Sequence, residues 1–171
     1  MKFSLVFPGQ GSQAPGMMSA YGESALVRDT FAEASAALGR DLWQLVSEGP
    51  AEAMNQTVNT QPLMLTAGIA AYRLWLSRGG PQPAIVAGHS LGEYSALVAA
   101  GAIEFADAVP LVELRARAMQ EAVPAGTGAM AAILGLDAAT VRGICAEVAQ
   151  GQIVEAVNLN APEQTVIAGH T

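Results

Sequence analysis

The sequence predicts an α/β protein built on a mostly parallel sheet. Two short apolar runs, residues 2–7 and 84–87, have the length of buried strands and are bounded by proline or glycine. Apolar residues recur at helical spacing over residues 21–38, 62–77 and 105–122. Strands that alternate with helices in this way favour a parallel sheet covered by helices.

The first strand and the first helix end at residues that interrupt regular structure. The strand at residues 2–7 stops at Pro8-Gly9, because proline has no N–H for a ladder and glycine favours turns. The Ala-rich helix at residues 21–38 stops at Gly39, and glycine is the residue type most common just past a helix C-terminus.

The second helix is predicted over residues 62–77. Pro62 suits a first helical turn, where its missing N–H removes no hydrogen bond, and Gly79-Gly80 closes the other end. The strand at residues 84–87 follows and contains only apolar side chains. We therefore expect it to be buried in the sheet.

The last part of the sequence has a different pattern. It predicts strands at 129–136, 153–157 and 165–168 and a helix at 138–149. The order β-α-β-β supplies four of the six elements of a ferredoxin-like unit. We therefore expect two domains: residues 1–125 form the N-terminal part of the α/β domain, and residues 126–171 form the first part of the ferredoxin-like one.

Composition and charge exclude several classes of function. Hydrophobic residues make up 51% of the chain and charged residues 13%, which provides a core and argues against disorder. No apolar stretch reaches the roughly 20 residues of a membrane span, and the N-terminal run is too short for a secretory signal. We therefore expect a cytoplasmic protein. The net charge of −7 and the single lysine, Lys2, leave no basic surface for nucleic acid.

Residues 88–92, Gly-His-Ser-Leu-Gly, match the G-x-S-x-G pattern of a nucleophile elbow. A predicted strand precedes them and a helix of small residues follows, which is the context that this motif requires. The turn would place the Ser90 hydroxyl at a helix N-terminus, where free N–H groups favour negative charge. The amide of Leu91 would then donate to an oxyanion. An ordinary glycine-bordered helix start is the alternative.

Residues 9–14, Gly-Gln-Gly-Ser-Gln-Ala, formally fit a dinucleotide-binding fingerprint. We reject that site because Pro15-Gly16 would break the required helix and no acidic residue ends a second strand about 20 positions later. Backbone N–H groups in this loop instead suit a second oxyanion donor, for which Gln10 is the candidate. A purely structural loop is the alternative.

A helical wheel over residues 108–122 places Arg115 on an apolar face. That face holds Ala108, Leu111, Val112, Leu114, Ala118, Met119 and Ala122. On the other face Arg117 has Glu113 and Glu121 four residues away on either side, as in a solvated ion-pair ladder. Because a guanidinium stays charged, a buried Arg115 needs an anionic partner. The wheel does not distinguish an internal carboxylate from a substrate carboxylate held by a bidentate fork.

Four short segments in this chain occur together in one order. They are residues 8–13 (Pro-Gly-Gln-Gly-Ser-Gln), residues 88–97 (Gly-His-Ser-Leu-Gly-Glu-Tyr-Ser-Ala-Leu), Leu114-Arg115, and residues 126–132 (Gly-Thr-Gly-Ala-Met-Ala-Ala). Together they resemble the malonyl-CoA:acyl carrier protein transacylase family. The resemblance implies an α/β-hydrolase-like large subdomain with a parallel sheet and an inserted ferredoxin-like small subdomain, incomplete in this chain.

The resemblance also implies roles for individual residues. Ser90 would be the nucleophile, the amides of Gln10 and Leu91 would form the oxyanion hole, and Arg115 would bind the malonyl carboxylate. The family's general-base histidine belongs to a segment C-terminal to this chain.

The two histidines in the chain are not expected to serve as that base. His89 immediately precedes Ser90, and a side chain at this position of an elbow points away from the nucleophile. His170 lies just past a predicted strand of the second domain.

The reaction that the resemblance implies is ping-pong transfer of a malonyl group from malonyl-CoA to the pantetheine thiol of acyl carrier protein, which supplies fatty-acid synthesis. It needs neither a metal nor a redox cofactor. The start at Met1 favours a stand-alone enzyme over an acyltransferase domain in a polyketide or fatty-acid synthase. A patatin-like or α/β-hydrolase esterase would share the serine motif, and a non-catalytic carrier-binding fragment would explain the missing base.

Overall fold

The computed structural model describes residues 2–124 and 126–171 as two compact units, Met1–Gln120 and Glu121–Thr171. The boundary predicted from the sequence falls at Ala125, which lies outside the described residues. The mixed α/β class with a parallel strand pair is confirmed. No helix of the described part of the chain is long and apolar enough to cross a membrane.

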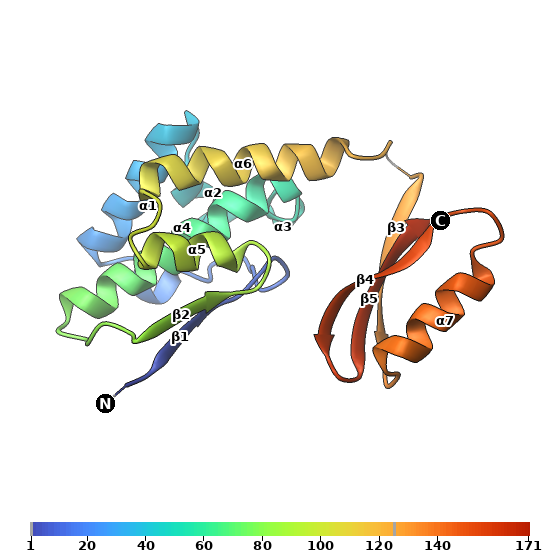
Figure 1. Ribbon diagram of the computed structural model, residues 1–171. Helices are drawn as coiled ribbons and strands as arrows, with labels where there is room; N and C mark the ends of the chain where they lie inside the picture. The colour runs from blue at the N-terminus through green and yellow to red at the C-terminus, as the bar shows by residue number, and fades with distance from the viewer. Residues whose placement is uncertain (1, 125) are drawn as a thin grey trace. The chain divides into compact units, whose positions relative to one another are not determined.

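The sheet of the first unit consists of two parallel strands, β1 (Ser4–Phe7) and β2 (Ile85–Gly88). Their register pairs Ser4 with Ile85 and Phe7 with Gly88, so both strands end at the same edge (Figure 1). The connection between them contains a 3-10 turn at Ser19–Tyr21 and four helices. These are α1 (Ala25–Leu38), α2 (Leu42–Glu48), α3 (Ala51–Met54) and α4 (Thr57–Ser77).

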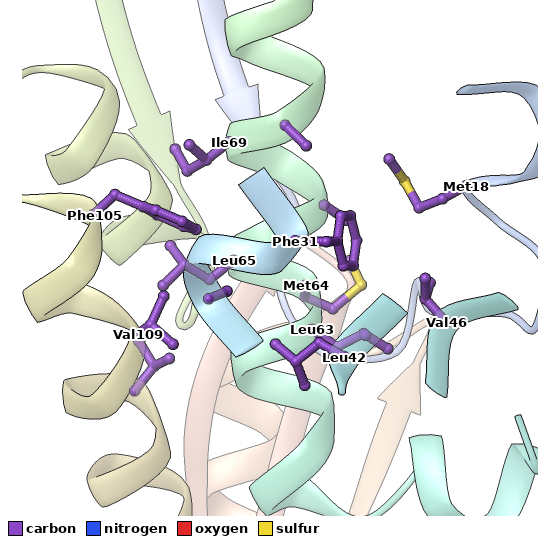
Figure 2. Close-up of a cluster of buried hydrophobic side chains, with 14 of the residues drawn as sticks. Met18, Phe31, Leu42, Val46, Leu63, Met64, Leu65, Ile69, Phe105 and Val109 are labelled. Atoms are coloured by element: carbon purple, nitrogen blue, oxygen red, sulfur yellow. The ribbon is translucent and has the colours of Figure 1, made fainter. Parts of the chain in front are cut away.

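Two helices follow β2 in the first unit, α5 (Gly92–Ala99) and α6 (Phe105–Glu121). The core lies where α1, α4 and α6 meet (Figure 2). Phe31 of α1, Leu65 and Ile69 of α4, and Val109 of α6 are each at most 1% exposed. Burying side chains of this size contributes about 1.5–3 kcal/mol each. This cluster therefore fixes the helices that carry the candidate site.

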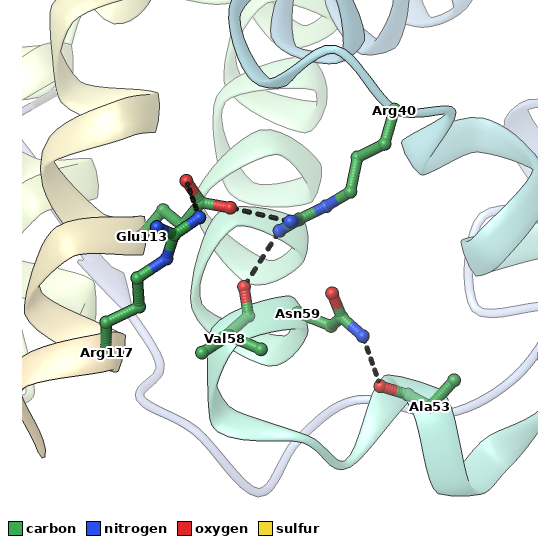
Figure 3. Close-up of polar contacts among 6 residues, drawn as sticks. All are labelled: Arg40, Ala53, Val58, Asn59, Glu113 and Arg117. Carbon is green, nitrogen blue, oxygen red and sulfur yellow. Dashed lines mark hydrogen bonds and ion pairs between the residues drawn. The ribbon is translucent and has the colours of Figure 1, made fainter. Parts of the chain in front are cut away.

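The helix α4 begins five residues earlier than predicted, so Pro62 lies inside it. A proline there removes the N–H that would have bonded to the carbonyl oxygen of Val58. That oxygen instead accepts a hydrogen bond of 2.9 Å from Nη2 of Arg40 (Figure 3). The Nη1 atom of Arg40 lies 2.6 Å from Oε1 of Glu113 on α6. Arg40 thus satisfies the carbonyl that Pro62 leaves free and links α4 to α6.

The second unit has the expected strand, helix, strand and strand. They are β3 (Gly128–Leu134), α7 (Ala138–Val148), β4 (Val154–Ala161) and β5 (Gln164–His170). The sheet order is β3-β5-β4 and both pairings are antiparallel, so β3 and β4 run in the same direction on either side of β5. The helix α7 buries Val141 and Cys145 and contacts β4 and β5.

Asp137 is the N-cap of α7. Its Oδ1 accepts hydrogen bonds of 2.9 Å from the amides of Ala139 and Thr140. Its Oδ2 accepts a 2.8 Å bond from the Thr140 hydroxyl. These bonds, led by that from the Thr140 amide, lower the pKa of the Asp137 carboxyl below its ordinary value of 3.8.

Candidate active site

Ser90 lies in a sharp turn between the end of β2 and the start of α5. Its φ angle is 53°, a left-handed conformation that side-chain-bearing residues rarely adopt and that costs on the order of 1–3 kcal/mol. The turn is held by hydrogen bonds from the amide of Gly92 to the carbonyl of His89 (2.8 Å) and from Glu93 to Ser90 (3.2 Å). The strained geometry leaves Ser90 exposed at the helix N-terminus.

The two glycines of the turn are required by close backbone contacts. A Cβ atom on Gly88 would lie 1.9 Å from the carbonyl carbon of Gly92. A Cβ atom on Gly92 would lie 2.2 Å from the carbonyl oxygen of Phe7 in β1. The first residue of α5 therefore packs directly against the backbone of both strands, and this packing sets the position of Ser90.

The loop after β1 lies beside this turn. The amide of His89 donates to the carbonyl oxygen of Phe7 at 3.2 Å. A Cβ atom on Gly9 would lie 2.9 Å from the His89 carbonyl oxygen and 3.0 Å from its Nδ1. The structure thus brings the loop that contains Gln10 to the same edge of the sheet as Ser90, where α/β proteins bind their ligands.

The backbone amides of Gln10 and Leu91 are not bonded to other protein groups among the hydrogen bonds of residues 2–124 and 126–171. The side chain of Leu91 is anchored in the core at 1% exposure. The side-chain Nε2 of Gln10 lies 3.4 Å from Oγ1 of Thr57. The loop that contains Gln10 and the turn that contains Leu91 therefore each carry an amide without a protein acceptor in the described part of the chain.

Arg115 on α6 reaches the turn. Its Nη2 donates to Oγ of Ser90 at 3.0 Å, and its Nη1 donates to Oε1 of Gln61 at 2.7 Å. Its guanidinium carbon lies 5.7 Å from the ring centroid of Tyr94. The sequence left open whether an internal carboxylate pairs with Arg115. No Asp or Glu does so in the part of the chain that the structure describes.

The helical wheel was wrong about part of the apolar face of α6. Leu111, Leu114 and Met119 are 40%, 64% and 48% exposed. The side chains that α6 buries are Phe105, Ala108, Val109, Val112 and Ala116. Apolar side chains cover a wider arc of the helix than the core can contact, and the surplus stays on the surface. Arg115 is half-buried at the margin of the packed face, within reach of Ser90.

Glu113 was also expected on the solvated face, but its side chain is only 15% exposed. It contacts Arg117 at 3.2 Å, as the sequence predicted, and Arg40 at 2.6 Å, which the sequence did not reveal. Figure 3 shows the glutamate between the two arginines. Arg117 therefore belongs to an ion-pair cluster that does not include Arg115.

The histidines occupy different units. The ring of His89 lies against Gly9 of the neighbouring loop. His170 ends β5 in the second unit, and its Nδ1 lies 3.1 Å from the amide of Ile153. The same Nδ1 lies 3.3 Å from the carbonyl oxygen of Ile153, so this nitrogen contacts both backbone groups of one residue.

Residues 4–171 match the family described as the acyl transferase domain. The chain belongs to this family. The malonyl CoA-acyl carrier protein transacylase of Escherichia coli strain K12 is 62% identical to this acyl transferase domain over 170 residues, which are 99% of this chain and 55% of that protein.

Solved structures agree with this assignment to the acyl transferase family. The acyl-carrier-protein S-malonyltransferase of Burkholderia pseudomallei 1710b is 63% identical, with a TM-score of 0.96 over 100% of this chain and 56% of that chain. A complex of a type II PKS acyl-carrier protein with its malonyl-transacylase matches at 56% identity and a TM-score of 0.96, over 100% of this chain and 56% of that chain. The chain therefore spans about half the length of the relatives it matches.

Sequence reasoning missed Gln61 in this acyl transferase domain. Its side chain is 1% exposed and contacts Arg115. The predicted helix began at Pro62, which left Gln61 in a loop where a polar residue needs no explanation. Extending the helix through the proline would have placed a glutamine on a buried face, and a buried amide needs hydrogen-bond partners.

Proposed function

We propose that the protein containing this chain transfers a malonyl group from malonyl-CoA to the pantetheine thiol of acyl carrier protein, a step that supplies fatty-acid synthesis. The observation that carries this proposal is the 3.0 Å contact between Arg115 and the Ser90 hydroxyl in its left-handed turn. The names of the Escherichia coli relative and of the solved carrier-protein complex support the same substrates.

Ser90 is the proposed nucleophile. Its oxygen attacks the thioester carbon of malonyl-CoA, the carbon–sulfur bond breaks, and coenzyme A leaves with a proton. The pantetheine thiol of the carrier protein then attacks the Ser90 ester and takes the malonyl group, which restores the hydroxyl. A serine needs a base to remove its proton, and we assign this role to a histidine that is neither His89 nor His170.

The amides of Gln10 and Leu91 are the proposed oxyanion hole. Neither amide has a protein acceptor in the described part of the chain, and the loops that carry them meet at one edge of the sheet. Two donors aimed at the developing negative charge stabilise the tetrahedral intermediate, and removing one such donor costs about 2.7–4 kcal/mol in comparable sites. Hydroxyl and amides supply the chemistry, so we propose that no cofactor takes part.

Arg115 is the proposed ligand of the malonyl carboxylate. In a malonyl group only one methylene separates the thioester carbonyl from the carboxylate, so a cation that binds the carboxylate must lie close to the nucleophile. The Nη2 atom of Arg115, 3.0 Å from Oγ of Ser90, meets this requirement. An acetyl group would leave the guanidinium without an anionic partner, which gives selectivity for a carboxylated acyl group.

We also propose that the first unit is the N-terminal part of an α/β-hydrolase-like subdomain and that the second is part of an inserted ferredoxin-like subdomain. The strand order β3-β5-β4 with a crossover helix supports the second assignment, because a split β-α-β unit has this arrangement. Residues 1–125 and 126–171 would then be the corresponding segments.

The test uses the full natural chain that contains this sequence. Incubation with malonyl-CoA, followed by proteolysis and mass spectrometry, should find a malonyl ester on the peptide that contains residues 88–92, and Ser90→Ala should abolish it. An adduct that survives this substitution, or that maps to Cys145, would disprove the role of Ser90. Product analysis with carrier protein present separates transfer from hydrolysis, because an esterase would release free malonate.

A further inference from the structure

Gln61 is a polar side chain buried near the start of α4. It is 1% exposed, and both ends of its amide are used. Its Oε1 accepts a hydrogen bond of 2.7 Å from Nη1 of Arg115, and its Nε2 lies 3.3 Å from Sδ of Met119. A guanidinium can only donate, so the atom that faces Arg115 must be the amide oxygen. The orientation of the Gln61 amide is therefore fixed by its two partners.

The two terminal nitrogens of the Arg115 guanidinium have different partners. Nη1 is bound by Gln61, and Nη2 faces the Ser90 hydroxyl. An arginine side chain has many rotamers, and each hydrogen bond to its planar fork restricts them. Gln61 itself cannot swing away, because its side chain is enclosed in the core and Leu63 and Leu65 on the same helix are buried. The Nη1 end of the guanidinium is therefore held by a residue of α4, and the Nη2 end faces the hydroxyl of Ser90, the proposed nucleophile.

The partner of Arg115, Gln61, is neutral, whereas three other arginines of the first unit contact a glutamate. Arg40 and Arg117 contact Glu113, and Arg73 contacts Glu33 at 2.6 Å. A carboxylate beside Arg115 would neutralise its charge and occupy the donors that an anionic ligand needs. An amide oxygen orients the guanidinium without removing its positive charge.

We propose that Gln61 is a positioning residue that determines specificity for carboxylated acyl groups. It holds Arg115 through Nη1, so that the fully charged guanidinium presents its remaining donors beside Ser90. This inference rests on the proposed function, because it concerns the same acyl-binding site. Gln61 acts through Arg115 and does not itself contact the acyl group.

The decisive variant is Gln61→Glu, which keeps the shape of the side chain and its bond to Nη1 but adds the competing carboxylate. In the full natural chain, kcat/KM for malonyl-CoA should fall by about 10- to 100-fold, the range expected for weakening one hydrogen bond to a charged group. The loss should lie mainly in KM, because the carboxylate is bound equally in the ground and transition states. Acetyl-CoA transfer should stay within about threefold, as for a change that affects no contact of that substrate.

Gln61→Met is the second variant, which removes the anchor but adds no charge and keeps the length of the side chain. It should also raise KM for malonyl-CoA, and by less than Gln61→Glu. Gln152→Glu is the matched control: it adds the same charge at an exposed position of the second unit and should leave both substrates unchanged. Thermal unfolding of each variant shows whether it is folded.

The outcomes separate the inference from the proposed function. If the unaltered protein forms no malonyl ester on Ser90, the proposed function fails. If it forms the ester, and folded Gln61→Glu or Gln61→Met keeps the malonyl-to-acetyl ratio of the unaltered protein, the role of Gln61 is overturned. A variant that lowers transfer of both acyl groups by the same factor also overturns it, because that pattern describes a purely structural side chain.

Discussion

The Nη2 atom of Arg115 donates a hydrogen bond to the Oγ atom of Ser90 over 3.0 Å. The two residues belong to different elements, α6 and the turn before α5. The bond uses a lone pair of the hydroxyl oxygen, the atom that would attack a thioester. A carboxylate is a stronger acceptor than a hydroxyl, so an entering malonyl group should take this donor and release the oxygen. In the proposed mechanism the contact would thus connect binding of the malonyl carboxylate by Arg115 to the availability of the Ser90 hydroxyl.

Arg115→Ala should therefore act on one substrate and not on the other. We expect kcat/KM for malonyl transfer to fall by an amount equivalent to about 2–5 kcal/mol, the scale for truncating one partner of a buried charge pair. Acetyl transfer should stay constant or rise, because the acetyl group has no carboxylate. Steady-state kinetics with both thioesters measures the two effects.

Arg117→Ala is the internal control for this prediction. Arg117 lies two residues away on α6 and pairs with Glu113, which keeps Arg40 as a partner. The change should alter activity and stability by no more than about 0.5 kcal/mol, as is usual at the surface. Equal losses of malonyl transfer in the two variants would contradict the role assigned to Arg115.

Gly88→Ala should disrupt the turn that holds Ser90. The added methyl would lie 1.9 Å from the backbone of Gly92, and neither strand nor helix can move away without losing its packing. We expect a loss of more than about 4 kcal/mol in the free energy of unfolding, the exceptional range for a single substitution, or no folded protein at all. Denaturant unfolding measures this loss.

Gly143→Ala provides the matched comparison for the glycine of the turn. Gly143 is exposed in α7, and an added Cβ would meet no atom within 4 Å. Alanine has the higher helix propensity, so this variant should gain about 0.5–1 kcal/mol of stability. Similar losses at the two glycines would show that the close contact at Gly88 is not what destabilises the turn.

Arg40→Met should destabilise the first unit. The substitution leaves the Val58 carbonyl without its donor and removes one cation from the mostly buried Glu113. An unsatisfied polar group of this kind costs about 1–3 kcal/mol. Since Arg117→Ala removes the other cation from Glu113 but frees no carbonyl, it should lower the unfolding free energy by less than Arg40→Met does. No difference would mean that water replaces Arg40 at this carbonyl.

The sequence was sufficient for the elements with strong local patterns. The runs that became β1 and β2 are short, apolar and bounded by glycine or proline, so both strands were predicted within one or two residues. The burial expected for the second strand was wrong, because Ile85 is 62% exposed. The helices α2 and α3 were missed because, at seven and four residues, they are too short for a helical period to stand out. The start of α4 was missed because Pro62 was predicted to lie in its first turn. Arg40, which donates to the carbonyl that Pro62 leaves free, is distant in the sequence.

The candidate site shows the same division between local and long-range information. The sharp turn at Ser90 could be predicted from five consecutive residues, because the turn is a local structure. The partner of Arg115 could not, since Gln61 is 54 residues away and the helical wheel gives only a direction relative to the axis of α6. The wheel also cannot tell which part of a wide apolar arc the core will cover, and this explains the exposed Leu114.

Asp137 should make the stability of the second unit depend on pH. The folded state lowers the pKa of this carboxyl below 3.8, so its contribution is present above that value and is lost as the pH falls through the lowered pKa. Asp137→Asn keeps an N-cap acceptor but does not titrate. The difference in unfolding free energy between the two proteins should therefore grow as the pH rises from the lowered pKa to about 3.8 and level off above it. An NMR titration of Asp137 with a midpoint at or above 3.8 would contradict this prediction.

His170→Gln should leave acyl transfer nearly unchanged. The Nδ1 atom of His170 already accepts the amide of Ile153, and the glutamine side-chain oxygen can take over that acceptor role. We expect kcat/KM of the full natural chain to stay within about threefold of the unaltered protein, as for a surface substitution. Loss of a true general base would instead lower kcat on the order of 10⁴-fold or more. A loss of that size with normal formation of the carrier-protein complex would make His170 the base and overturn the assignment of this role to another histidine.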